Sequence, residues 1–363
     1  MDFISLRENT ISLKAEAETL IESVENPQYI STLNSFISSI KRLVDFLDDS
    51  KNIEVLSDYD KKPDSTKDKC PLDILCKDLY AKLVEVEAAL DIAVFNYMKQ
   101  DNNTISNERT QRIVSSVHTR SMGITELNTR LNALFENNLV SVFEVLKYLS
   151  GHNKTLIILG ANGSGKTSFA NYLKNVETHV KVIPANKPIT VTGYFQSHYN
   201  STIKTVRDEL FKNKASQELL LKLIISLCSE HDDCARIYND GGCKTKSTYD
   251  KVKEIFDEFF EVKLDNSAFS CREIKGKKVM GEPYAFNDMS DGERVAFFYI
   301  ATVIVAPPQS FIVVDEPENH LNPAIYNKIW DRLMELRSDC QFIFISHTME
   351  FINARSDFEL GGV

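Results

Sequence analysis

The stretch that decides the fold runs from Thr155 to Thr167 and reads TLIILGANGSGKT. Its first five residues are an apolar, β-rich run, and the glycine-rich segment 160–167 follows directly. This segment matches GxxxxGK[ST] in the strand-to-helix context that the pattern requires. The glycines let successive backbone N–H groups face a phosphate, and the following helix adds the positive end of its dipole. We therefore predict a phosphate loop in which Lys166 reaches the β- and γ-phosphates and Thr167 holds Mg²⁺. The residues expected to contact the nucleotide are Gly160, Asn162, Gly163, Ser164, Gly165, Lys166, Thr167 and Ser168.

A pair of acids ends a second apolar run, in FIVVDEPENH at 311–320. The carboxyl ends of parallel strands meet at the edge of the sheet where ligands bind, so Asp315 and Glu316 are expected there. Asp315 is predicted to orient Mg²⁺, directly or through water, and Glu316 to polarise the attacking water. An isolated pair of acids could instead cap a helix, but beside a phosphate loop that interpretation is poor.

A third motif opens the segment MSDGERVAFFYIATVIVAPP at 289–308. Ser290 is a natural helix N-cap, Gly292 leaves the backbone unobstructed, and an almost wholly apolar helix follows. The sequence predicts a buried helix whose N-terminus faces outward.

These motifs resemble those of the ABC ATPase superfamily, whose signature LSGGQ lies between the phosphate loop and the strand with two acids. Here Met289–Glu293, the signature segment, stands in that place. Gln196 in GYFQS matches the Q-loop glutamine, His347 after FIFIS matches the switch histidine, and 319–323 occupy the D-loop position. Five motifs in the family's order, within about 155–350, are far more specific than any one of them.

The resemblance implies a composite site, in which ATP and Mg²⁺ lie between the phosphate loop of one subunit and the signature segment of another. Ser290, Gly292 and Glu293 would then bind the nucleotide of the opposite subunit in a homodimer or higher oligomer. The resemblance implies catalytic roles for Glu316, His347 and Gln196. It also implies that Gln196 is a metal ligand, together with Thr167 and Asp315.

Three residues depart from the pattern of transporter ATPases. Asp291 replaces the first signature glycine, Glu293 replaces the glutamine, and Asn322 stands where an aspartate is usual. These changes look more like the soluble ABC ATPases of DNA repair and phage defence. In particular, SDGER followed by DEPENHLNP is similar to the ATPases of PARIS-type and OLD-type defence systems. The resemblance implies an ATPase that acts as a sensor or switch, triggered by a phage protein or DNA.

Two other functions stay open at this point. A DNA-repair or chromosome-maintenance ATPase would show DNA-stimulated hydrolysis and usually long coiled-coil arms, which are not visible between the motifs. A non-hydrolysing scaffold would use ATP only to hold a dimer together, and Glu316 argues against it. No acidic cluster of the Toprim kind follows DEPENH, so a nuclease effector is expected as a separate protein or in a missing C-terminal region.

The predicted fold is an α/β, P-loop ABC-type ATPase domain over 151–363, with a helical insertion at about 200–285, preceded by an all-helical region over 1–150. We expect the helical region either to form partner or dimer contacts or only to pack against the ATPase domain. Its apolar stripes indicate that these faces are buried, but they do not indicate what covers them. The stripes are Leu33, Phe36, Ile37, Ile40, Val44 and Leu47, then Leu72, Leu75, Leu79, Leu83, Val86, Leu90 and Ala93. The predicted strands are TLIIL at 155, VKVIP at 180, FIVVD at 311 and FIFIS at 342.

The borders of the predicted ATPase domain are unusual for the family. The residues before 155 read as a helix where antiparallel strands are usual. The chain also ends about sixteen residues after His347, so we expect a trimmed edge or a fragment of a longer protein.

The composition is that of an ordinary globular protein, with 363 residues, 43% hydrophobic and 26% charged. A net charge of -10 argues against a diffuse basic surface that coats nucleic acid. Neither a signal peptide nor a run of about 18 apolar residues is visible, so we expect a cytoplasmic protein without a membrane partner.

Seven cysteines do not suggest a disulfide framework in such a chain. One cluster offers soft ligands at Cys228, His231, Cys234 and Cys243, but it contains no CxxC pair. Because its spacing fits no standard zinc pattern, we expect it to hold no zinc.

Overall fold

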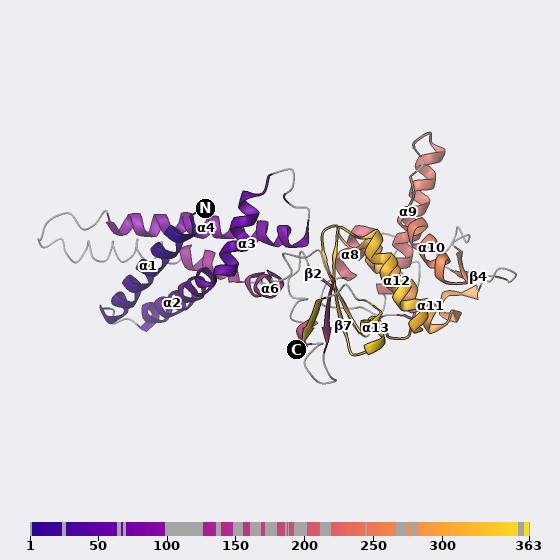
Figure 1. The fold of residues 1–363 in the computed structure, drawn as a ribbon. Coiled ribbons are helices and arrows are strands. Elements are labelled where there is room, and N and C mark those ends of the chain that lie inside the picture. Colours follow the sequence, from indigo (N-terminus) through magenta and orange to yellow (C-terminus); the bar gives the residue numbers. More distant parts are fainter. Residues whose placement is uncertain are drawn as a thin grey trace, which may run out of the picture. The chain divides into compact units, whose positions relative to one another are not determined.

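The computed structural model describes most of the chain. The described residues are 2–23, 27–63, 67, 70–98, 126–135, 139–147, 155–159, 168–170, 180–185, 187, 189–191, 202–210, 219–243, 245–265, 275–277, 282, 284–354 and 359–362. The chain divides into two compact units, Met1–Gly151 and His152–Val363. Figure 1 shows both, and each is described here by itself.

The N-terminal unit is helical, as predicted. Its helices are α1 (Phe3–Ser23), α2 (Pro27–Asp48), α3 (Ser50–Lys61), α4 (Pro71–Met98), a helix over 126–135, and α6 (Leu139–Leu146). The stripes of α2 and α4 face the core: Phe36 and Ile40 of α2, and Leu79 and Leu83 of α4, are fully buried. Burial of apolar side chains at helical spacing therefore holds this unit together. The segment before 155 contains α6, which confirms the predicted helix there.

A parallel sheet forms the centre of the C-terminal unit. Its strands are β1 (Leu156–Leu159), β2 (Val180–Ile183), β6 (Phe311–Asp315), β7 (Gln341–Ser346) and β8 (Glu359–Gly362), in the order β2-β6-β7-β1-β8. All neighbouring pairs are parallel, and all five residues of β6 are buried. The four predicted strands and the α/β fold are confirmed. After His347 the chain adds the short helix α13 (Met349–Asn353) and β8, elements that the sequence analysis did not predict.

Helix α11 (Asp291–Val305) is the central helix of this unit, and it packs on α10 (Thr248–Phe259) and α12 (Pro323–Leu336). From Val295 to Val303 every side chain of α11 is buried, as the apolar sequence predicts. Tyr299 makes an edge contact with Trp330 of α12, and Trp330 contacts Phe344 of β7 in the same way. The helix is thereby fixed against the sheet through large aromatic side chains.

The predicted helical insertion has two parts. Its helices are α8 (Ile203–Leu210), α9 (Leu219–Asn239) and α10 (Thr248–Phe259). A small antiparallel sheet of β3 (Lys263–Asp265), β4 (Lys275–Lys277) and β5 (Tyr284–Ala285) follows, and a single turn, η4 (Phe286–Asp288), leads to α11. The expectation of a mostly helical block missed this sheet, because strands of two or three residues are too short to show a period.

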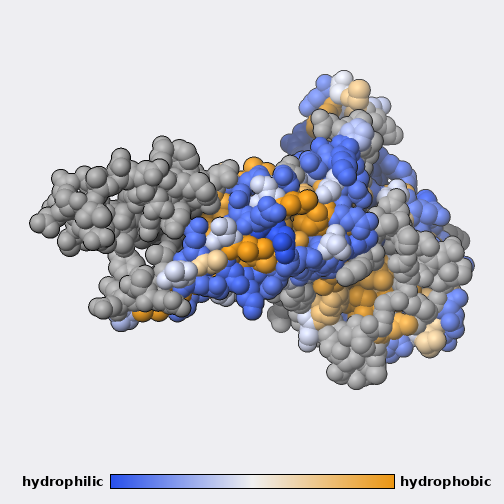
Figure 2. Space-filling model, turned by 60° about the vertical axis from the view of Figure 1, so that its left-hand side comes forward, coloured by the Kyte–Doolittle hydropathy of each residue, from blue (hydrophilic) through white to orange (hydrophobic). Residues whose placement is uncertain are grey.

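Helix α9 is buried over its first half and exposed at its far end, where Ile237 and Tyr238 are each more than half exposed. This end is the uppermost feature of Figures 1 and 2, and in Figure 2 its surface is mostly hydrophilic. No helix in the described part of the chain is long and apolar enough to cross a membrane.

Candidate functional site

Two of the three predicted catalytic residues, Glu316 and His347, lie at the carboxyl edge of the parallel sheet. Asp315 ends β6 and pairs in register with Ile345 of β7, so Glu316 and His347 follow neighbouring strands. Leu159 ends β1 beside Ser346 of β7, so the strand before the predicted phosphate loop ends at the same edge. Residues 160–167 and Gln196 lie outside the described residues, and Ser168 is an exposed residue of a helical segment over 168–170.

Glu316 has an unusual backbone conformation. Its φ is 52°, in the left-handed region that non-glycine residues rarely adopt. Its N–H donates to the carbonyl of Ile345 at 2.9 Å, and its Oε2 accepts from Asn319 Nδ2 at 2.9 Å. Asp315 beside it is buried, at 2% exposed. The two acids are therefore held in different ways, one inside the sheet and one at its rim.

Two donors from distant parts of the sequence meet at the carbonyl oxygen of Glu316. Tyr299 Oη donates to it at 3.0 Å, and Lys187 Nζ donates to it at 3.3 Å and to the carbonyl of Ala185 at 2.9 Å. Burial lowers the pKa of Lys187 to about 8, although Glu316, Asp315 and Glu318 act in the opposite direction. Burial raises the pKa of Tyr299 well above its usual value. The sequence analysis missed both residues, because neither belongs to a motif.

Glu318 organises the end of β7. Its Oε1 accepts from Ser346 Oγ and from Thr348 Oγ1, both at 2.8 Å, and lies 3.6 Å from Nδ1 of His347. Its Oε2 is buried without a hydrogen-bond partner among the described residues. The side chain of His347 is 45% exposed. The carboxylate of Glu318 thus fixes the hydroxyl groups of Ser346 and Thr348, the two residues that flank the predicted switch histidine. The imidazole of His347 remains accessible.

The signature segment begins α11 with a capping box. Glu293 N–H donates to Ser290 Oγ at 3.3 Å, and Ser290 N–H donates to Glu293 Oε2 at 2.8 Å. Ser290 is thus the N-cap, as predicted, and Asp291 pairs with Arg294. A Cβ on Gly292 would come within 3.3 Å of the carbonyl oxygen of His320, so only glycine lets this turn approach the D-loop position without displacing it.

The donor set at the strand ends suits a magnesium nucleotide in part. Carboxylate oxygens are preferred Mg²⁺ ligands, and Mg²⁺ is usually bound by one or two of them together with phosphates and water. Within the described residues no group of three or more His, Cys, Asp or Glu side chains is placed to hold a metal by itself. Asp315 is the one predicted ligand that is described; Thr167 and Gln196 fall outside.

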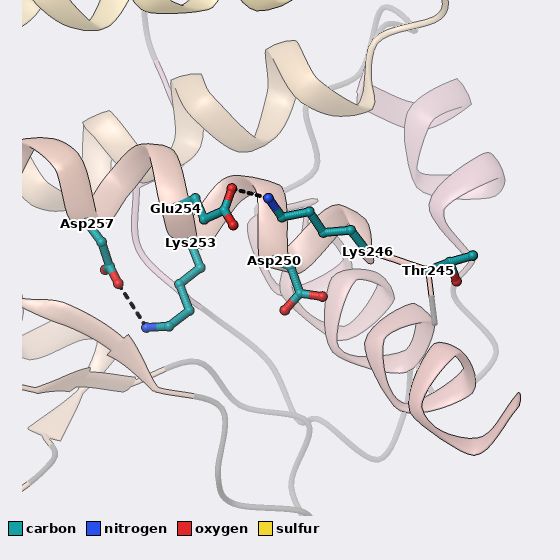
Figure 3. Close-up of a pocket in the computed structure, with 6 residues that line it drawn as sticks. All are labelled: Thr245, Lys246, Asp250, Lys253, Glu254 and Asp257. Carbon is teal, nitrogen blue, oxygen red and sulfur yellow. Dashed lines mark hydrogen bonds and ion pairs between the residues drawn. The ribbon is translucent and has the colours of Figure 1, made fainter. Parts of the chain in front are cut away.

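The cysteine and histidine cluster makes other contacts. His231 Nδ1 lies 2.9 Å from Ser247 Oγ, Cys228 is buried, and Cys243 is exposed. Nearby, Thr245, Lys246, Asp250, Lys253, Glu254 and Asp257 line an open pocket of about 550 Å³ (Figure 3). Its lysines already have partners, since Lys246 pairs with Glu254 and Lys253 with Asp257. The charges there are satisfied internally and point to no ligand.

The comparisons with known proteins agree with a nucleotide-binding domain. Residues 245–353, which contain the signature segment, β6 and β7, match the family model "AAA domain, putative AbiEii toxin, Type IV TA system". The phosphate import ATP-binding protein PstB 1 of Lactobacillus acidophilus is 22% identical over 237 residues, 63% of this chain and 77% of that protein. The PstB protein of Malacoplasma penetrans is 25% identical over 228 residues, 62% of this chain and 72% of that protein.

Two solved structures match parts of this chain. One is an Smc head bound to the C-winged helix domain of ScpA, with 13% identity, a TM-score of 0.33, and coverage of 58% of this chain and 87% of that one. The other is an Smc head with an extended coiled coil from Pyrococcus furiosus, with 14% identity and a TM-score of 0.25. That match covers 89% of this chain and 54% of the other, about half of its length. The family model and the curated relatives support a P-loop ATPase of the ABC/AAA kind, distantly related to PstB.

Proposed function

We propose that this chain binds ATP with Mg²⁺, hydrolyses it in a head-to-tail dimer, and acts as a switch in prokaryotic anti-phage defence through a separate effector. The observation that carries the proposal is the meeting of Asp315, Glu316 and His347 at one edge of β6 and β7. Phosphoryl transfer to water needs a residue that orients the water and groups that stabilise charge on the phosphate. Glu316 has the first role and His347 the second, while Mg²⁺ neutralises phosphate charge.

The N-terminus of α11 supports the dimer. Its two acids, Asp291 and Glu293, are engaged with Arg294 and with the N–H of Ser290, which reduces their repulsion toward a phosphate. Ser290 itself is exposed. A helix N-terminus of this kind favours an anion, and in the proposed dimer that anion is the γ-phosphate bound by the opposite subunit.

The defence role rests on the departures at Asp291, Glu293 and Asn322, and on the description of the matching family model. That description names a putative toxin and a type IV TA system. Both favour a switch that acts with another protein over a subunit of an importer. The proposed effector is a nuclease encoded separately or in a further part of the protein.

ATP turnover by the purified chain and its Glu316→Gln variant tests the enzymatic part. Removal of the water-orienting carboxylate is expected to lower turnover by ~100-fold or more and to leave ATP binding intact. Glu261→Gln is the matched control, because Glu261 is exposed and lies between α10 and β3. Its turnover is expected to stay at the wild-type level.

Two outcomes would contradict the proposal. Full turnover by Glu316→Gln would remove its catalytic role. A wild-type chain that dimerises with ATP but never hydrolyses it would instead support the non-hydrolysing scaffold. For the defence role, a phage challenge of cells that carry the chain with its natural gene neighbours is decisive, since protection should disappear with Glu316→Gln.

A further inference from the structure

The backbone of Glu316 is a meeting point of three segments. Its oxygen accepts from Tyr299 of α11 and from Lys187 of the segment that follows β2, while the N–H of the same residue binds β7. The donors lie 17 and 129 residues away in sequence. Contacts of such range form only in the folded domain, so the peptide of Glu316 is fixed by tertiary structure.

These contacts hold a conformation that the chain would otherwise avoid. A non-glycine residue at a φ of 52° is strained and persists only when its surroundings enforce this conformation. Rotation of Glu316 out of this conformation would carry its carbonyl away from both donors. The direction of its side chain is therefore coupled to Lys187 and Tyr299.

The amine of Lys187 is itself held in place. It donates to the carbonyl of Ala185 at 2.9 Å and lies 5.1 Å from the centre of the Tyr299 ring. That ring is fully buried and packs edge-on against Trp330 at 4.7 Å between centroids. A lysine between backbone carbonyls and an aromatic face keeps its charge in one position, close to the acids at the strand ends.

We propose that Lys187, together with Tyr299, is a positioning residue that fixes the backbone of Glu316 and so aims its carboxylate at the attacking water. The inference rests on the proposed function, because it needs Glu316 to orient that water. It assigns a role in hydrolysis to residues outside every motif of the sequence.

The test compares kcat and KM for ATP in variants of the full chain. Lys187→Met removes the donor and the charge, and is expected to lower kcat about tenfold while KM for ATP changes less than about twofold. Lys187→Arg keeps a charged donor and should recover much of the loss. Tyr299→Phe removes only the hydroxyl and should lower kcat about threefold.

Lys263→Met is the matched control. Lys263 Nζ also donates to two backbone carbonyls, those of Asp257 at 2.7 Å and Phe260 at 3.2 Å, but it lies in β3. Wild-type kcat in this variant shows that the loss of a carbonyl-bound lysine does not by itself impair turnover.

A double-mutant cycle separates a positioning role from a structural one. In the Glu316→Gln background, measured under single-turnover conditions, Lys187→Met should change the rate less than about twofold, since its target is already gone. An undiminished tenfold loss in that background would overturn the inference, and so would a wild-type kcat for Lys187→Met alone.

If Lys187→Met does not fold, the same cycle with Tyr299→Phe decides. If Glu316→Gln keeps turnover, the proposed function fails; if it loses turnover while Lys187→Met does not, only the inference fails.

Discussion

The two ends of strands β6 and β7 both carry polar networks, but the networks differ in charge and in completeness. At the amino end, Arg337 donates to the carbonyls that follow α11 and pairs with Asp339, which in turn accepts from the N–H of Gln309. At the carboxyl end, Asp315, Glu316 and Glu318 lie near one lysine, Lys187. The amino end is thus close to neutral, whereas acids outnumber cations at the carboxyl end of the described structure.

The difference shows what distinguishes a stabilising network from a site. Both ends contain a non-glycine residue in the left-handed region, Gln309 at 54° and Glu316 at 52°, so backbone strain alone does not identify a site. At the amino end the strained residue, Gln309, donates its N–H to Asp339, which is itself paired with Arg337. At the carboxyl end Glu318 Oε2 is buried without a partner in the described part, and His347 stays exposed. Excess acid and open polar groups suit a bound cation and a phosphate.

The largest effect is expected at the signature segment, which in the proposed dimer completes the ATP site of the other subunit. Ser290→Arg should bind ATP through its intact phosphate loop but hydrolyse it ~100-fold more slowly as a homodimer, because the arginine would block the helix end that we propose to contact the partner's nucleotide. ATP binding and steady-state turnover, measured on the same preparation, should therefore separate.

A mixture of variants controls this prediction. Lys166→Ala chains mixed with Ser290→Arg chains should regain part of the activity, since one interface then joins an intact phosphate loop to an intact signature segment. Adding Glu316→Gln to the Ser290→Arg chain should remove the recovery. A fully active Ser290→Arg homodimer would show that the signature segment is not part of the site.

At the amino end, replacement of a single side chain should lower stability and leave turnover largely unchanged. The side chain of Arg337 is only 12% exposed, and its guanidinium donates to the carbonyls of Val303, Ala306 and Pro307. Arg337→Met should therefore lower the free energy of unfolding in urea by ~2–4 kcal/mol. Turnover per folded molecule should stay within about twofold of the wild type, since no catalytic group moves.

Arg332→Met is the matched control, because Arg332 lies in α12, the helix that Arg337 caps at its C-terminal end. Arg332 pairs with Glu258, but both side chains are more than a third exposed, so the loss should stay under ~1 kcal/mol. Equal losses for the two variants would mean that the amino-end network does not stabilise the domain.

The amino end should also show a pH dependence. Burial raises the pKa of Asp339, but hydrogen bonds from Arg337 and from the N–H of Gln309 outweigh it and hold the pKa at about 2. Because this value lies below the unfolded value of 3.8, the stabilisation is present above about pH 4 and is lost as the pH falls toward 2. The carboxyl group is partly exposed, so the contribution is only ~1 kcal/mol. Urea unfolding between pH 2 and 5 should show a shallower acid slope for Asp339→Asn; an unchanged slope would contradict the assignment.

The sequence predicted the framework of both ends and little of their chemistry. Apolar runs predicted β6 and β7, and the position of Asp315 and Glu316 at the end of an apolar run predicted that they lie at the carboxyl edge of the sheet, where the ends of parallel strands meet. Lys187 and Arg337 could not be found in this way. Their roles depend on contacts with carbonyl groups far along the chain, and any surface lysine or arginine has the same local sequence signal.

The smallest effect is expected from Glu318→Gln, which tests whether shape or charge matters next to His347. Both hydroxyl donors, Ser346 and Thr348, bind the same carboxylate oxygen, and an amide oxygen can accept from both in its place. The amide nitrogen would then occupy the position of Oε2, which is buried without a hydrogen-bond partner among the described residues, so no hydrogen bond of the described structure is lost. The free energy of unfolding should therefore change by less than ~1 kcal/mol, whereas Glu318→Ala, which leaves two hydroxyls without their acceptor, should cost ~1–3 kcal/mol. Thermal unfolding of both variants distinguishes these values. A Glu318→Gln variant as unstable as Glu318→Ala would show that the negative charge itself holds the end of β7, and the carboxyl end would then depend on electrostatics for stability as the amino end does.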